Sequence, residues 1–225
     1  MKKKLLFMVS SMNIGGVEKS LLSLLSVIPK DKYDITILTL EKKGGFLDHI
    51  PSNIKVEEAT WFKDIKSIIM ESPQSTVRRY LAKGKLFKIP SFIYSYYKSK
   101  NTGDRYIYYK NILKSIPYNE EVYDAAIAYA GPTEIIDAYI GYKVKANKKF
   151  AWVHFDISKH KINKSLYENL YIRFNKIFTV SNEANENLNK ILPITVGKSE
   201  VLLNIITKDL IKEMAEEKVD FDSSY

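Results

Sequence analysis

Short runs of apolar residues alternate with segments of helical periodicity through most of this 225-residue chain. Several of the short runs are apolar at nearly every position, which is typical of strands that are covered on both faces. Strands that alternate with helices usually form a parallel sheet with helices packed on both sides. The pattern therefore predicts an α/β fold, a single Rossmann-like domain with a mainly parallel, doubly wound sheet. The predicted strands are residues 4–10, 34–40, 54–57, 124–129, 149–154, 176–180 and 200–203.

The clearest helix follows the first predicted strand. Apolar side chains recur at helical spacing over residues 17–28, and the helix begins at Gly15 and Gly16. In parallel sheets, ligands bind where the carboxyl ends of strands lead into helices, and paired glycines let a ligand approach the backbone closely. Residues 10–18 are therefore a candidate binding loop, and a tight turn without a ligand is the alternative. The glycine spacing fits neither the dinucleotide fingerprint nor a phosphate-binding P-loop.

The pattern changes between residues 61 and 118, where helical segments with basic faces are interrupted by Gly84, Pro90 and Gly103. We expect a helical insertion between two strands. It holds twelve Lys and Arg against three Asp and Glu, an excess equal to the net charge of +9 of the whole chain. It also holds twelve of the 28 Phe, Trp and Tyr residues. Two interpretations remain open: docking on an anionic membrane surface, or a solvated helical face whose tyrosines pack inward. No nucleic-acid partner is expected, because no binding motif for one is present.

Composition narrows the class of protein. The chain has no cysteine, so disulfides and thiolate metal sites are excluded, and a cytoplasmic location is expected. The amino-terminal lysines and apolar run imitate a secretion signal, but the run stops at Ser10 without a cleavage site, which indicates a buried strand. No run of about 18 apolar residues is present, so any membrane contact is expected to be peripheral, on the inner face.

His154 closes the predicted strand of residues 149–154, at the end where ligands of parallel sheets bind, so it is a candidate for a catalytic or binding role. A neutral imidazole there can donate to or accept from a hydroxyl of a ligand, and it titrates near physiological pH. A histidine satisfied by a nearby carbonyl is the alternative. A metal site with Asp156 and His160 is a third interpretation, but its irregular spacing and missing fourth ligand argue against it. We expect neither a metal nor another cofactor.

Three further polar residues are candidates for the binding site at the carboxyl ends of the strands. Glu18 lies in the first turn of the first helix, where the helix dipole alone favours a carboxylate. Ser181 and Asn204 follow the last two predicted strands. Both are interpreted first as helix-cap or turn residues and second as cleft residues.

Four segments of the chain together resemble family 4 glycosyltransferases. Residues 6–10 followed by Gly15-Gly16-Val17-Glu18 are similar to the first βα unit of that family. Residues 149–154 are similar to its strand ending in histidine, and residues 177–181 and 199–206 to the last two strands of its amino-terminal domain. The order and spacing agree across nearly the whole chain, except over the helical insertion.

The resemblance implies a GT-B fold, in which two Rossmann-like domains face each other across a cleft. The amino-terminal domain holds the acceptor, and the carboxyl-terminal domain holds the nucleotide-sugar. The glycine loop lies beside the reaction centre and the histidine bonds to the donor sugar, which implies roles for Gly15, Gly16 and His154. Transfer would retain the anomeric configuration without a metal. A basic face suits a cell-envelope glycan or a lipid-linked acceptor.

The family's glutamate pair and second glycine-rich loop, which belong to the donor domain, are not found after Asn204. Residues 220–225 look like a polar tail or an interrupted hinge. We therefore expect residues 1–225 to be the acceptor-binding half of the enzyme and to be inactive alone. The alternative is a stand-alone Rossmann-like binding module that recruits lipid or protein partners.

Overall fold

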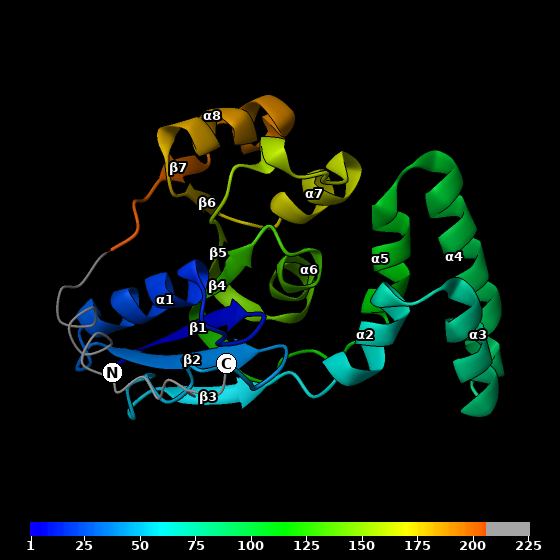
Figure 1. The fold of residues 1–225 in the computed structure, drawn as a ribbon, viewed down its shortest axis with the longest axis horizontal. Helices are drawn as coiled ribbons and strands as arrows, with labels where there is room; N and C mark the ends of the chain where they lie inside the picture. Colours follow the sequence, from blue (N-terminus) through cyan, green and yellow to red (C-terminus); the bar gives the residue numbers. More distant parts are fainter. Residues whose placement is uncertain (206–225) are drawn as a thin grey trace, which may run out of the picture.

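The computed structural model describes residues 1–205, so Ile206 and the polar segment 220–225 lie outside the described residues. At its centre is one parallel sheet in the order β3-β2-β1-β4-β5-β6-β7 (Figure 1). The strands are β1 (Lys3–Val9), β2 (Tyr33–Thr39), β3 (Lys55–Glu58), β4 (Val122–Gly131), β5 (Lys145–Val153), β6 (Lys176–Thr179) and β7 (Ser199–Val201). All seven predicted strands are confirmed, with bounds that differ by a few residues.

Helices cover both faces of the sheet, as predicted. α1 (Gly16–Val27) covers one face, where Phe7 and Val9 of β1 pack with Leu21. α6 (Glu134–Lys143), α7 (Lys164–Tyr171) and α8 (Asn182–Ile191) cover the other, where Leu6 and Met8 join their core. Because side chains alternate along a strand, β1 is buried on both sides, which explains its unbroken apolar run. Short 3-10 turns occupy Ile157–Lys159 and Pro193–Thr195.

The predicted insertion between β3 and β4 is confirmed as helical. Figure 1 shows it beyond the carboxyl ends of the strands, with α3 and α4 farthest from the sheet. Local sequence sets its breaks: Ser72 caps α3, Gly103 ends α4 in the left-handed conformation, and Asp104 caps α5. Its elements are α2 (Phe62–Met70), α3 (Pro73–Ala82), a 3-10 turn at Leu86–Lys88, α4 (Ile89–Thr102) and α5 (Arg105–Leu113).

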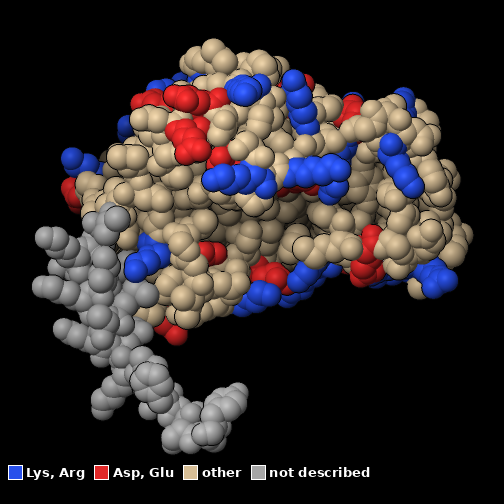
Figure 2. Space-filling view, turned by 45° about the horizontal axis from the view of Figure 1, so that its top comes forward, with Lys and Arg blue, Asp and Glu red and all other residues tan. Residues whose placement is uncertain are grey.

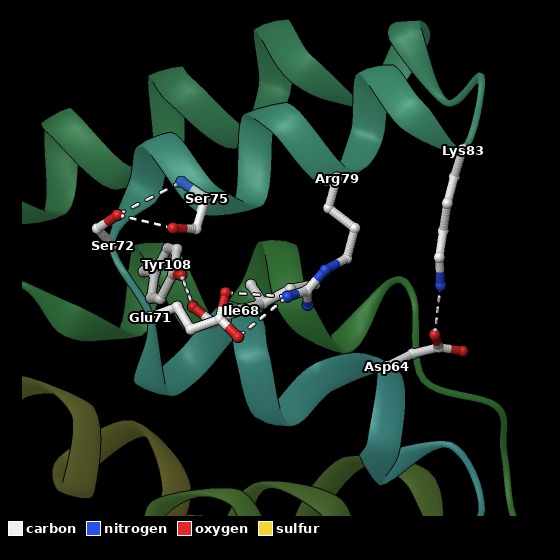
Figure 3. A network of polar contacts seen from close by, with 8 residues as sticks. All are labelled: Asp64, Ile68, Glu71, Ser72, Ser75, Arg79, Lys83 and Tyr108. Carbon is white, nitrogen blue, oxygen red and sulfur yellow. Dashed lines mark hydrogen bonds and ion pairs between the residues drawn. The ribbon is translucent and has the colours of Figure 1, made fainter.

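Polar contacts fasten the first two helices of the insertion together (Figure 3). Arg79 of α3 donates to both carboxylate oxygens of Glu71, at 3.0 and 2.9 Å. Lys83 pairs with Asp64 of α2 at 2.9 Å. From α5, the hydroxyl of Tyr108 donates to the carbonyl oxygen of Ile68 at 2.6 Å. The insertion is thus a packed unit.

The aromatic residues of the insertion divide into a buried group and an exposed group. Tyr80, Phe92 and Tyr108 are buried and contact one another, as the packing interpretation predicts. Phe87 and Tyr94 are exposed by more than half. Within residues 1–205, no helix has the length and apolar character needed to cross a bilayer.

Candidate functional site

One cavity lies at the point where the chain changes direction across the sheet. β1 and β4 are neighbours, but the chain winds outward from them to opposite edges. In doubly wound sheets, ligands bind in the crevice at the carboxyl ends of those two strands. A cavity of about 360 Å³ occupies this position, between the sheet and the insertion. Its lining is mixed, with apolar Leu40, Phe62, Ile69, Met70 and Ile135 and polar Ser10, Ser11, Asn13 and Thr133.

One wall of this switch-point cavity carries a small charge cluster. Glu41 follows β2, and its carboxylate pairs with Lys43 at 2.8 Å and with Lys66 of α2 at 2.6 Å. Hydrogen bonds from Lys43, and then from Lys66, lower the pKa of Glu41 to about 2. Glu41 therefore stays ionised at physiological pH, and the cluster of one carboxylate and two lysines has one more positive charge than negative. It suits a ligand that carries hydroxyl or anionic groups.

The opposite wall comes from α6 and α5. Glu134, in the first turn of α6, pairs with Arg105 at 2.9 Å, and Tyr109 of α5 lies beside them. Burial, followed by the charge of Glu134, raises the pKa of the Tyr109 hydroxyl well above its ordinary value. Tyr109 is therefore a neutral hydrogen-bonding group in this wall.

Behind that wall lies a carboxyl group without charge compensation. Asp137 of α6 is completely buried; its Oδ2 accepts a hydrogen bond from the amide of Thr133 at 3.1 Å, and its Oδ1 has no partner among the described residues. Burial raises the pKa of Asp137 well above its ordinary range. The neutral acid is thus favoured, directly behind a residue that lines the cavity.

The loop after β1 is braced by the loop after β2. The amide of Met12 donates to the carbonyl oxygen of Lys43, and the amide of Phe46 donates to the carbonyl oxygen of Met12, both at 2.9 Å. Gly44 lies between these bonds with a φ of 118°. A β-carbon there would stand 2.1 Å from the backbone of Met12, so only glycine allows this approach.

The predicted glycine loop lies at the end of the loop after β1, where α1 begins. Gly15 is the N-cap in an extended conformation, and the carboxylate of Glu18 folds back over it. Gly16 has no positive φ, and a β-carbon added to it would meet no atom within 4 Å. The fold itself therefore does not require glycine at residue 16, which leaves open space beside the amides at the start of α1.

His154 directly follows β5 on the α1 face of the sheet. Its ring lies 4.5 Å from that of Tyr129 and stacks on Trp152 at 5.9 Å, measured between ring centroids. Its Nε2 is buried and has no partner among the described residues, and neither has Nε1 of Trp152. Burial lowers the pKa of His154 to about 4, although a backbone hydrogen bond at Tyr129 opposes the shift. The ring is therefore neutral at physiological pH.

A short hydrogen-bond chain connects Tyr129, whose ring contacts this histidine, to α1 and to the segment after β7. The hydroxyls of Tyr129 and Ser20 are 2.9 Å apart, and Ser20 donates to Oδ1 of Asn204 at 2.8 Å. Since the ring of Tyr129 also contacts the ring of His154, one polar group joins two segments of the sequence resemblance, 149–154 and 199–206, to the helix that a third segment opens. We call Ser20, Tyr129, His154 and Asn204 the α1-face polar group.

The predicted site residues fall into two sets. In the first set, His154 and Asn204 come together through the α1-face polar group, which includes Ser20 of α1. Gly15, Gly16 and Glu18 belong to this set because they form the start of α1. Ser181 is separate: its hydroxyl accepts from the amide of Ala184 at 3.1 Å and caps α8, the role given first from sequence. Their roles toward a ligand stay predictions.

Sequence reasoning found the switch-point cavity only in part: Ser10, Ser11 and Asn13 of the predicted binding loop 10–18 line it. None of the six predicted site residues lines it among the residues described. Glu41 and Thr133 each follow a strand that was predicted, so the strand-end rule applied to Ser10 would have found them. Lys66 and Tyr109 come from the insertion and carried no such signal.

The three proposed metal ligands are not assembled. Asp156 instead caps a 3-10 turn by accepting from the amide of Ser158, and the ring of His160 packs on Phe155. Within residues 1–205 no group of three His, Asp or Glu side chains could hold a metal ion.

Figure 2 shows a hollow between the α/β body and the insertion, with Lys and Arg side chains along its edge.

Comparisons with known proteins give matches among solved structures. No protein-family model matches the chain, and no curated protein sequence does. A crystal structure of Anabaena HepE in complex with UDP and glucose is similar, with 15% identity and a TM-score of 0.48, over 90% of this chain and 44% of that one. A second, with UDP, has 14% identity and a TM-score of 0.48, over 95% of this chain and 49% of that one. This chain spans about half the length of the HepE chain.

Proposed function

We propose that residues 1–225 are the acceptor-side domain of a retaining glycosyltransferase of the GT-B type, similar to family 4. The full-length enzyme would transfer a sugar from a nucleotide-sugar to a cell-envelope glycan or a lipid-linked acceptor. The proposal rests on the four sequence segments in family order and on the polar groups that converge at the carboxyl ends of the strands. The nucleotide-sugar would be held mainly by a second domain, as in that family.

The observation that supports this proposal best is the unpaired Nε2 of His154. A buried polar atom without a partner costs about 1 to 3 kcal/mol, so it needs an explanation. A hydroxyl of the donor sugar, arriving at the end of β5, would supply the missing hydrogen bond. Because the neutral ring carries one proton and donates it to the backbone at Tyr129, the unpaired Nε2 would accept a hydrogen bond from that hydroxyl.

The start of α1 has a second role in this proposal. Its free amides and its dipole favour an anion, and Gly16 leaves space for one to approach. The diphosphate that departs with the nucleotide is such an anion, so these amides would stabilise the charge that develops during transfer. Glu18 lies over Gly15 and must move aside or bond to a hydroxyl instead.

The switch-point cavity is the proposed acceptor site. Its apolar wall suits the carbon face of a sugar ring, while Asn13, Thr133 and Glu134 offer hydrogen bonds to hydroxyls. The cavity is lined by Asn13, two positions before Gly15 of the glycine loop. An acceptor held there would have a hydroxyl oriented toward the donor. The residues of this domain therefore bind and position the acceptor, and we expect residues 1–225 alone to carry out no transfer.

The test is a transfer assay with the full-length gene product and a panel of labelled nucleotide-sugars, with a cell-envelope extract as acceptor. We expect labelled glycan from the full-length protein with one donor, and none from residues 1–225. If the full-length protein neither hydrolysed nor transferred the sugar of any donor, that result would contradict glycosyl transfer. Turnover by residues 1–225 would contradict the assignment as one half of the enzyme.

A further inference from the structure

α4 carries apolar side chains on two opposite faces. The inward face packs into the insertion through Phe92, which is 1% exposed, and Tyr96. The outward face presents Ile93, Tyr94 and Tyr97, spaced so that they lie on one side of the helix. A helix that only packs on a core keeps one apolar stripe, so the second stripe calls for a partner.

The connection between α3 and α4 extends this apolar surface. Leu86 and Phe87 lie in the 3-10 turn just before α4, and Leu81 lies at the end of α3. Together they form what we call the outer surface of the insertion, on the two helices that lie farthest from the sheet in Figure 1. Its members and their exposed fractions are Leu81 (54%), Leu86 (58%), Phe87 (76%), Ile93 (39%), Tyr94 (62%) and Tyr97 (53%).

Positive charge surrounds these six residues. Residues 72–104 contain seven Lys and Arg and one acid, Asp104. The two neighbouring acids, Asp64 and Glu71, are occupied by Lys83 and Arg79 (Figure 3). Asp104 is itself engaged as the N-cap of α5.

Four basic residues of the outer helices consequently have no acidic partner among the described residues, and all four are exposed. They are Arg78, Lys85, Lys98 and Lys100. The outer surface therefore combines exposed apolar and aromatic side chains with uncompensated positive charge. A second copy of the chain would bring the same charge to the contact and be repelled.

We propose that this outer surface docks on an anionic lipid bilayer. Basic residues near such a surface contribute about 1 kcal/mol each. Aromatic rings settle at the headgroup level, and a helix lying in the interface plane buries its apolar stripe in the acyl boundary. Leu86 and Phe87 would insert, Tyr94 and Tyr97 would lie at the headgroups, and the four basic side chains would contact lipid phosphates. This docking is independent of sugar transfer, so either proposal can fail without the other.

The experiment is flotation of the purified protein with vesicles of phosphatidylcholine alone, or of phosphatidylcholine and phosphatidylglycerol in about equal amounts. We expect binding to the anionic vesicles only, weakened by salt. Arg78→Gln with Lys85→Gln removes two charges and should lower the partition coefficient roughly 30-fold. Lys145→Gln with Lys148→Gln is the matched control, since these exposed lysines lie at the start of β5, the opposite end of the sheet. That control should bind like the unchanged protein.

A second pair of variants tests the apolar contacts. Phe87→Ser with Tyr94→Ser should lower partitioning by about tenfold or more. Ile172→Ser with Val196→Ser removes comparable exposed side chains elsewhere and should not. Because Phe87 and Tyr94 are mostly exposed, the first pair should fold normally, which circular dichroism checks.

Three outcomes would overturn the proposal. They are equal losses in the test and control variants, binding to phosphatidylcholine as strong as to the anionic mixture, and no flotation at all. A dimer in solution that Phe87→Ser abolishes, without any lipid binding, would assign the surface to a second copy instead.

Discussion

The contact between the loops after β1 and β2 makes a sharp prediction for Gly44. Gly44→Ala forces a residue with a β-carbon to a φ of 118° and places that carbon 2.1 Å from the carbonyl carbon and oxygen of Met12. The left-handed backbone costs about 1 to 2 kcal/mol, and the clash with backbone, which cannot turn aside like a side chain, about 1 to 3 kcal/mol more. We therefore expect a loss of about 2 to 5 kcal/mol in the free energy of unfolding.

Gly16→Ala is the matched control. The same methyl group is added to the first residue of α1 at the same edge of the sheet, but the new carbon meets no atom within 4 Å and no positive φ is required. Alanine is a better helix former than glycine, so stability should be unchanged or slightly higher.

Urea unfolding followed by circular dichroism measures both variants. With a slope of about 2.5 kcal/mol per M, near the upper end for urea because the slope grows with chain size, the Gly44→Ala midpoint should fall by about 1 to 2 M, while that of Gly16→Ala stays in place. Equal midpoints for the two variants would refute the reasoning, because the loop after β2 would then not brace the loop that leads to the candidate site.

Further predictions concern the buried ionisable groups and Gly16. The pKa of His154 is about 4 in the folded protein, against about 6.5 unfolded; between these values the unfolded chain binds a proton that the folded one does not. Stability should therefore fall by about 1.4 kcal/mol per pH unit as the pH drops from 6.5 to 4, and His154→Phe should remove this dependence in urea unfolding curves. For Asp137 the sign is opposite: its folded pKa is raised, so its contribution is full below the unfolded pKa near 4 and is lost as pH rises toward the folded value. Asp137→Asn keeps the acceptor for the Thr133 amide and should flatten that decline; a slope equal to that of the unchanged protein would count against a buried neutral acid. Finally, Gly16→Ala should keep its stability but lower sugar transfer by the full-length enzyme, and undiminished turnover would favour a turn without a ligand.

The sheet could be predicted from sequence because its signal is local. β1 is buried on both faces, so it appears as an unbroken apolar run over residues 5–9 without knowledge of its neighbours. The start of α1 at Gly15 and the helical character of residues 61–118 could be predicted for the same reason. The strand bounds were predicted less closely, since β4 continues to Gly131, past the apolar residues that announced it.

The candidate site could be predicted only in part, because its contacts join distant segments. The hydrogen bond between Ser20 and Asn204 spans 184 positions, and no spacing rule indicates it. The cavity forms only when α2 and α5 fold over the edge of the sheet. Lys66 and Tyr109 therefore could not be recognised as cavity residues from sequence alone. The orphaned Nε2 of His154 likewise depends on its burial among Tyr129 and Trp152.

The most direct test of the account compares two histidine variants of the full-length protein in the sugar-transfer assay. His154→Ala removes the side chain whose Nε2 is proposed to bond to the donor sugar. His160→Ala makes the same change at an exposed histidine whose ring packs on Phe155. The account predicts that His154→Ala lowers turnover by about 100-fold or more while the protein stays folded, and that His160→Ala has little effect. Equal turnover of the two variants would contradict it.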